Sequence, residues 1–148
     1  MKTGVSILSK KGNIYQWGAA CMDELKIRIH AFTMDCRNPE ELARFYAALL
    51  NWKMKVLNED WAYVYSPENE AMPCILFQRD PDYVPPVWPG KPGEQQQMAH
   101  LDFDVGDLDK AVEHAMRCGA RAAEVQFADN WKVMLDPAGH PFCLCMSE

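Results

Sequence analysis

The sequence predicts an α+β fold in which two tandem copies of one β-α-β-β-β unit form a single domain. The first observation is a repeated stretch: Pro67 follows Trp61 by six residues, and the same spacing separates Trp131 from Pro137 in the second half of the chain. The second is a capped amphipathic helix that recurs at nearly the same offset, and such a repeat indicates duplication of one structural unit. A chain of 148 residues buries one core readily, whereas two independent domains would be cramped.

The first helix is predicted to begin at Pro39, directly after the good N-cap residue Asn38. Glu41 stands three residues after that cap, which is the spacing of a capping box. The apolar residues that follow recur at i, i+3, i+4 and i+7 and form one helical stripe: Leu42, Phe45, Tyr46 and Leu49. The strand before this helix and the strands after it complete a first unit at residues 27–79.

The second helix is predicted to begin after Asp107, which is the counterpart of Asn38 in the repeat and suits the same capping position. Gly119 follows the last turn, where a left-handed residue commonly ends a helix. The apolar stripe consists of Leu108, Ala111, Val112, Ala115 and Met116. This helix belongs to a second unit at residues 98–146, inside one domain that spans residues 26–148.

Each Trp-to-Pro stretch leads through a turn into an apolar run that begins with proline. The runs occupy residues 73–77 and 141–145, and each is predicted to be the last strand of its unit. The tryptophans, the prolines after them, the helix caps and the apolar runs therefore all recur at nearly one offset, which makes coincidence the weaker explanation.

The segment that joins the two units, residues 80–97, contains five prolines. Proline lacks a backbone donor and fixes φ, so this crossing is predicted to be extended and fairly stiff rather than a helix or a central strand. Its apolar side chains, Tyr83, Val87 and Trp88, are expected to pack over one end of the sheet.

Residues 1–25 stand outside the repeat. Residues 5–8 and 13–17, separated by residues 9–12, have the pattern of a β-hairpin. An equally open alternative is that Met22 is the functional start and that the preceding residues are an upstream extension. We assign no chemistry to this segment.

The composition excludes two classes of partner. Lys and Arg number 15 and Asp and Glu 21, so the net charge is −6 and the chain lacks the basic surface that binds nucleic acid. No apolar run approaches the roughly 20 residues that span a bilayer, and Lys10 and Lys11 stand where a signal peptide has its apolar core. We therefore expect a cytoplasmic protein whose six cysteines are free thiols.

Four segments carry a resemblance to a known family: residues 82–89 of the crossing, the three glutamines at 95–97, the strand at 100–105 and the turn at 136–141. With the two tandem units they resemble the vicinal oxygen chelate superfamily, in its glyoxalase-like branch related to glyoxalase I and bleomycin-resistance proteins. The resemblance covers about residues 27–146. It implies a curved eight-stranded mixed sheet with a ligand on its concave face and the helices on its convex face. It also implies a homodimer.

The resemblance does not fix the reaction, because the superfamily includes lyases, dioxygenases, epimerases, antibiotic-modifying enzymes and binding proteins. In metal-using relatives, four ligands come from the first and last strands of both units, which places His100 and Cys143 at the second unit's positions. The offset between the two helix caps gives Ala31 as the counterpart of His100, and the offset between Pro73 and Pro141 gives Ile75 as that of Cys143. Neither side chain binds a metal. A divalent ion in such a site requires three or more protein ligands, and His100 and Cys143 are only two. We therefore predict no bound metal and no other cofactor.

A second ligand set stays open. A β-bulge that shifts the first strand by one residue would turn His30 inward in place of Ala31, and Gln78 would join it from the last strand. His30, Gln78 and His100 would then bind divalent nickel, zinc, manganese or iron in a lyase or isomerase of the glyoxalase type.

The polar side of the strand at 100–105 contains a candidate catalytic pair. His100 and Asp102 are two residues apart and share a face, where the carboxylate orients the imidazole as a general base. The residues expected to contact a ligand, Tyr63, Trp88, His100 and Cys143, favour a small, partly aromatic molecule. We therefore predict a small-molecule-binding protein without the four-ligand metal site. The alternatives are the metal-dependent enzyme and a metal-free acid–base enzyme that uses His100.

Overall fold

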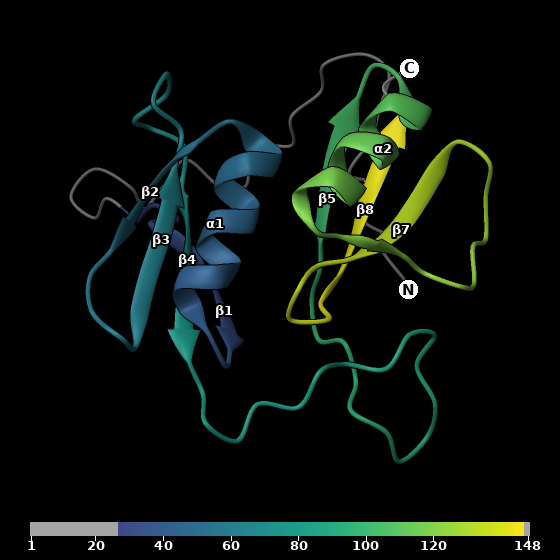
Figure 1. Cartoon of the computed structure of the whole chain (residues 1–148), viewed down its shortest axis with the longest axis horizontal. Coiled ribbons are helices and arrows are strands. Elements are labelled where there is room, and N and C mark those ends of the chain that lie inside the picture. The colour runs from purple at the N-terminus through teal and green to yellow at the C-terminus, as the bar shows by residue number, and fades with distance from the viewer. Residues whose placement is uncertain (1–26, 147–148) are drawn as a thin grey trace, which may run out of the picture.

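The computed structural model describes residues 27–146 and contains the two predicted β-α-β-β-β units (Figure 1). The first unit comprises β1 (Ala31–Cys36), α1 (Pro39–Leu50), β2 (Lys53–Val56), β3 (Trp61–Tyr65) and β4 (Cys74–Arg79). The second comprises β5 (Leu101–Val105), α2 (Leu108–Cys118), β6 (Arg121–Ala122), β7 (Trp131–Leu135) and β8 (Pro141–Met146). The hairpin and the alternative start considered for residues 1–25 lie outside the described residues. No helix in residues 27–146 is both long and apolar enough to cross a membrane.

The four strands of each unit form one mixed sheet. The strand order is β1-β4-β3-β2 in the first sheet and β5-β8-β7-β6 in the second. The first and last strands of a unit pair in parallel, and the other neighbours pair antiparallel. The eight strands of the predicted fold are therefore present, and over the described residues their ladders divide them into two sheets of four.

Both helices begin at the predicted caps. The side chain of Asn38 accepts a hydrogen bond from the backbone N–H of Glu41 at 3.2 Å, and Asp107 accepts one from that of Lys110 at 3.1 Å. These bonds satisfy N–H groups that the first turn of a helix leaves without a partner. Each helix packs over one face of its own sheet, and the two helices contact each other (Figure 1).

One aromatic side chain joins the cores of the two units. Tyr46 of α1 is fully buried and stacks on Phe77 of β4, with ring centroids 5.5 Å apart. The same ring lies 6.5 Å from that of Phe142 in β8, and its neighbour Phe45 lies 6.0 Å from Phe142. The helix-facing sides of both sheets therefore share one hydrophobic core.

The strand register separates a helix-facing side of each sheet from an open side that no helix covers. Ile75 pairs with Val64 on the helix-facing side and is 4% exposed, whereas the next residue, Leu76, pairs with Tyr63 on the open side. The prediction that Ile75 occupies the inward position equivalent to Cys143 is therefore wrong, because Leu76 occupies it. The true offset between the last strands is one residue shorter than the offset between their prolines, and an error of one residue turns a strand side chain to the opposite face.

A buried carboxylate connects both units with the crossing. Asp136, 1% exposed, accepts hydrogen bonds from the Tyr46 hydroxyl at 3.0 Å, from Nδ1 of His140 at 2.9 Å, and from the backbone N–H groups of Ala138 and His140. The other ring nitrogen of His140 lies 3.0 Å from the hydroxyl of Tyr83, which comes from the crossing. Burial, and then the charge of Asp136, raise the pKa of Tyr46, so that its hydroxyl stays protonated and able to donate.

Gly139 lets the crossing pass close to this turn. Its φ of 92° lies in the left-handed region, and a Cβ atom at this position would lie 2.9 Å from Cβ of Pro85. Both the backbone conformation and the short distance exclude a larger residue here.

Replacing Asp136 by alanine is expected to lower the free energy of unfolding by about 3 kcal/mol, because several buried donors lose their acceptor. Tyr46→Phe removes one hydrogen bond and keeps the ring packing, so we expect a loss of about 1 kcal/mol. Urea denaturation followed by circular dichroism measures both values. Equal losses in the two variants would show that the carboxylate is not the centre of this network.

Candidate functional site

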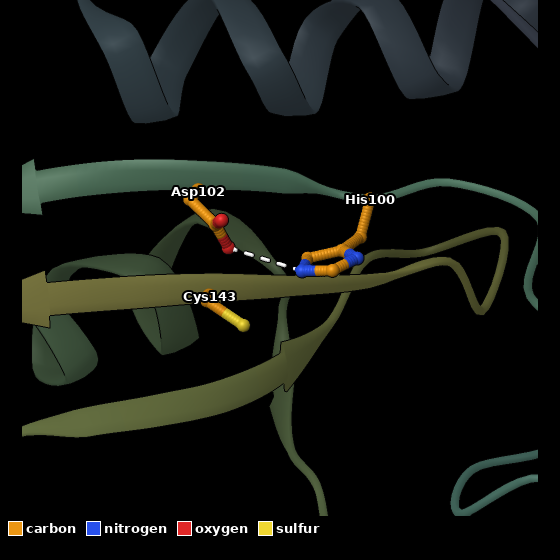
Figure 2. A group of neighbouring side chains, drawn as sticks. All are labelled: His100, Asp102 and Cys143. Carbon is orange, nitrogen blue, oxygen red and sulfur yellow. Dashed lines mark ion pairs between the residues drawn. The ribbon is translucent and has the colours of Figure 1, made fainter. Parts of the chain in front are cut away.

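Three polar side chains meet on the open side of the second sheet: His100, Asp102 and Cys143 (Figure 2). Asp102 of β5 and Cys143 of β8 are direct neighbours in the parallel register. His100 lies just before β5 and two residues from Asp102, so strand alternation brings both to the same side. One donor atom from each residue lies within 4.8 Å of those of the other two.

Two polar side chains flank the His100 ring, one at each ring nitrogen. Its Nε2 lies 3.2 Å from Oδ1 of Asp102, and its Nδ1 lies 2.7 Å from the side-chain nitrogen of Gln97. In this amide orientation Gln97 donates to Nδ1, so the ring proton resides on Nε2, the nitrogen nearest the carboxylate. The side chains of His100 and Asp102 are 40% and 61% exposed, so a ligand can reach the pair.

Cys143 is buried beside this pair and is 8% exposed. It packs with Ala123 and Val133 beneath the partly buried ring of Trp88. Burial, followed by a hydrogen bond to Asp102 and the charge of that carboxylate, raises the pKa of the Cys143 thiol to about 12. The thiol is therefore protonated at neutral pH and is a poor nucleophile in this state.

The crossing covers part of the open side of the second sheet. Trp88 packs against the cluster around Cys143, and its indole Nε1 donates to the carbonyl oxygen of Val125 at 3.3 Å. Its ring meets that of Phe127 edge-on, with centroids 5.9 Å apart. Trp88 therefore packs on the open face of the second sheet, in the same neighbourhood as Cys143.

Tyr63 lies elsewhere, on the open side of the first sheet. It lines a cavity of about 820 Å³ together with Tyr65, Lys53 and Leu76, and the two tyrosine rings are tilted, with centroids 5.7 Å apart. Residues 66–73, the loop between β3 and β4, form much of the wall. The four predicted ligand-binding residues are therefore divided between the two sheets.

The four-ligand metal site of the metal-using relatives does not fit this chain. The register places Ala31 and Leu76 at the first unit's positions, and neither side chain has a donor atom. The alternative set of His30, Gln78 and His100 requires a shift in β1, but β1 pairs with β4 without a bulge from Ala31 onward. His30 precedes the strand and lines the first-sheet cavity.

Two features of the site were missed by the sequence analysis: the contact of Gln97 with His100, and the contact of Asp102 with Cys143. The second had a usable signal, since parallel pairing of the first and last strands puts Asp102 next to Cys143. The first depends on the path of an irregular segment, which has no periodicity to interpret.

These two units, each with an open sheet side, define a protein of the vicinal oxygen chelate fold. More narrowly, the chain belongs to the glyoxalase-like domain family, whose model matches residues 31–145. The resemblance stated from the sequence is therefore confirmed. A comparison with curated proteins found no match.

Solved structures support the same fold. A glyoxalase/bleomycin resistance protein/dioxygenase family enzyme from Burkholderia phytofirmans is 15% identical, with a TM-score of 0.57 over 78% of this chain and 95% of that one. A glyoxalase-related enzyme from Fulvimarina pelagi is 15% identical, with a TM-score of 0.57 and coverage of 81% and 88%. The fosfomycin resistance protein FosX from Mesorhizobium loti is 12% identical, with a TM-score of 0.57 and coverage of 84% and 94%. At these identities the similarity shows the fold alone.

Asp102→Asn is expected to speed the alkylation of Cys143 by iodoacetamide at pH 8 several-fold, in protein kept in EDTA. The substitution removes the charge that disfavours the thiolate, so the pKa of Cys143 falls, although burial still holds it above the usual value. Mass spectrometry of the modified peptide gives the rate. Cys36 serves as the reference in the same sample, because burial is the largest cause of its raised pKa and Asp102 is not among the causes. An unchanged Cys143 rate would contradict the contact with Asp102.

Proposed function

We propose that this glyoxalase-like protein binds a small, partly aromatic molecule on the open side of its first sheet, without the four-ligand metal site of its metal-using relatives. The observation that carries this proposal is the cavity of about 820 Å³ beside Tyr63, a size typical of small-molecule sites. The cavity lies on the face that bears no helix, so a ligand enters without displacing the hydrophobic core.

The lining residues indicate the kind of ligand. The rings of Tyr63 and Tyr65 offer aromatic surface to a flat apolar group. Among the described residues of the wall, Lys53 and Arg28 are two basic side chains against one carboxylate, that of Glu70, and this balance of charge favours an anionic group. We infer that the ligand is an aromatic acid, with one ring and a carboxylate or phenolate.

A thermal-shift screen of benzoate and larger aromatic carboxylates is expected to find compounds that raise the unfolding midpoint, since a ligand at 100 times its Kd stabilises a protein by about 2.7 kcal/mol. Lys53→Met is expected to lower the affinity for such an acid about tenfold and to leave the affinity for its uncharged amide unchanged. Tyr63→Ala should weaken both compounds.

The matched control for this screen is His100→Ala, because His100 lies on the other sheet and should not affect either compound. Circular dichroism of each variant checks that the fold is kept. If no aromatic acid stabilises the protein, or if His100→Ala weakens binding as much as Tyr63→Ala does, the first-sheet cavity is not the binding site.

A metal-free acid–base enzyme is the second candidate, and the ordered contacts from Gln97 through His100 to Asp102 favour it. An imidazole held in one tautomer next to a carboxylate is the usual arrangement of a positioned general acid or base. An activity of this kind should persist in EDTA and disappear in both His100→Ala and Asp102→Asn.

The homodimer implied by the resemblance remains a prediction.

Nitrogen-15 NMR of the protein in EDTA is expected to show the His100 ring with its proton on Nε2. Gln97→Ala removes the donor to Nδ1, so the ring should then populate both tautomers. Gln96→Ala, at the adjacent position, is the control and should leave the His100 signals unchanged. Equal tautomer populations in the unaltered protein would rule out the hydrogen bond from Gln97 to Nδ1.

A further inference from the structure

We propose that the side chain of Trp88 is a gate for the open side of the second sheet. In the position that the structure shows, the indole packs over the cluster that contains Cys143. A change of side-chain rotamer moves the ring into a neighbouring cavity and uncovers that cluster. This gate depends on neither the ligand of the first-sheet cavity nor the acid–base activity.

Two contacts outside this cluster hold the ring in its closed position. The indole Nε1 donates to the carbonyl oxygen of Val125 at 3.3 Å, which is longer than the usual N–H···O distance of about 2.9–3.0 Å. The ring also meets that of Phe127 edge-on, and Phe127 is 61% exposed. One long hydrogen bond and one aromatic contact at the surface are weak enough for the ring to leave.

The two partners of the indole are themselves fixed to the sheet. Gln126 lies between Val125 and Phe127 in the chain, and its side-chain amide closes the edge of β7. Its Oε1 accepts from the backbone N–H of Val133 at 2.8 Å. Its Nε2 donates to the carbonyl oxygens of Val133 and Ala123, at 2.9 and 2.8 Å. The surface that the indole closes against therefore stays in place when the ring moves.

A cavity of about 540 Å³ lies beside the ring, lined by residues of the crossing between 87 and 97. A cavity of about 150 Å³ already holds a benzene ring, so this one has room for an indole. Gly90 puts no side chain in it, and even an added Cβ there would meet nothing within 4 Å. The backbone N–H of Val87 donates to the carbonyl oxygen of Gln95 at 2.9 Å and holds the base of this loop. The side chain of Trp88 can therefore move while the backbone stays.

The hydrogen bonding of Gln97 supplies an independent indication. Its Oε1 is buried without a hydrogen-bond partner, the one such side-chain nitrogen or oxygen in residues 27–146. A buried acceptor in this state costs free energy until a donor reaches it. Gln97 and Trp88 line the same cavity, so the indole N–H of the open position is the donor that this oxygen lacks. Both positions of the ring then offer Nε1 an acceptor, which a buried indole requires.

Opening changes what the second sheet can bind. With the ring in place, the accessible groups are the polar side chains of His100 and Asp102. With the ring moved, the apolar surface of Ala123, Val133 and Cys143 is added beside this pair. The gate therefore admits a molecule that carries an apolar group next to a polar one, and it shields the apolar surface from water when no such molecule is bound.

The experiment measures the alkylation of Cys143 by iodoacetamide in the full-length protein, in EDTA at pH 8, by mass spectrometry of the modified peptide. Because the reagent reaches the thiol only in the open position, the rate follows the open population. Phe127→Ala removes a contact of the closed position, so Cys143 should react about fivefold faster. Gln96→Phe fills the cavity that receives the ring, so Cys143 should react about fivefold more slowly.

Gln95→Phe is the matched control for the filled cavity, because Gln95 is adjacent to Gln96 and does not line that cavity. Cys143 should react in this variant as in the unaltered protein. Cys36 is the internal reference, since it is buried in the shared core and reacts faster only when the fold itself is weakened. A fixed cover predicts an unchanged Cys143 rate in all three variants.

An unchanged Cys143 rate in either Phe127→Ala or Gln96→Phe would overturn the proposal. The same holds if Gln95→Phe slows the reaction as much as Gln96→Phe does. A Cys36 rate that rises in step with that of Cys143 in Phe127→Ala would also overturn it, because the thiol would then be reached by unfolding rather than through a gate.

Discussion

The arrangement of the whole molecule depends on one desolvated charge, the carboxylate of Asp136. A buried carboxylate is tolerated only when its oxygens are fully hydrogen-bonded, and here the donors come from α1, from the last turn and, through His140, from the crossing. The carboxylate can accept from these donors only when Tyr46 of the first unit and Tyr83 of the crossing occupy fixed positions relative to the second unit. The same constraint therefore positions both sheets around their shared core and leaves the opposite sides of both sheets open.

On this common scaffold the open sides of the two units carry different side chains. The first unit has an aliphatic side chain at each position where metal-using relatives carry a ligand, Ala31 and Leu76, and it has a cavity lined in part by Tyr63. The second unit has His100 with Asp102 and Cys143 next to it, and it is partly covered by Trp88. The two units thus present open surfaces with different side chains, aromatic on the first sheet and polar on the second.

Most of the fold was predictable because its signals are local. Caps at Asn38 and Asp107, one apolar stripe per helix and the paired Trp-to-Pro stretches each depend on a few adjacent residues. The site was less predictable because it depends on register between distant strands. Ile75 was misplaced by a single residue, since the offset between the two units is shorter at their last strands than at their first strands. Because side chains alternate between the two faces of a strand, this error of one residue assigned Ile75 to the wrong side of the sheet. The true counterpart of Cys143 is Leu76. The role of Gln97 follows from an irregular backbone path that no pattern encodes.

The close approach of Pro85 to Gly139 has a consequence for anyone who redesigns this protein. A combinatorial library aimed at new ligands has freedom in the loop at residues 66–73, whose side chains surround the first-sheet cavity and bear little of the core. Position 139 has no such freedom, because a methyl group there would collide with Pro85 and displace the crossing, which contains Trp88. A library that keeps glycine at position 139 can therefore vary the loop around the first-sheet cavity while the crossing and the second unit keep their structure.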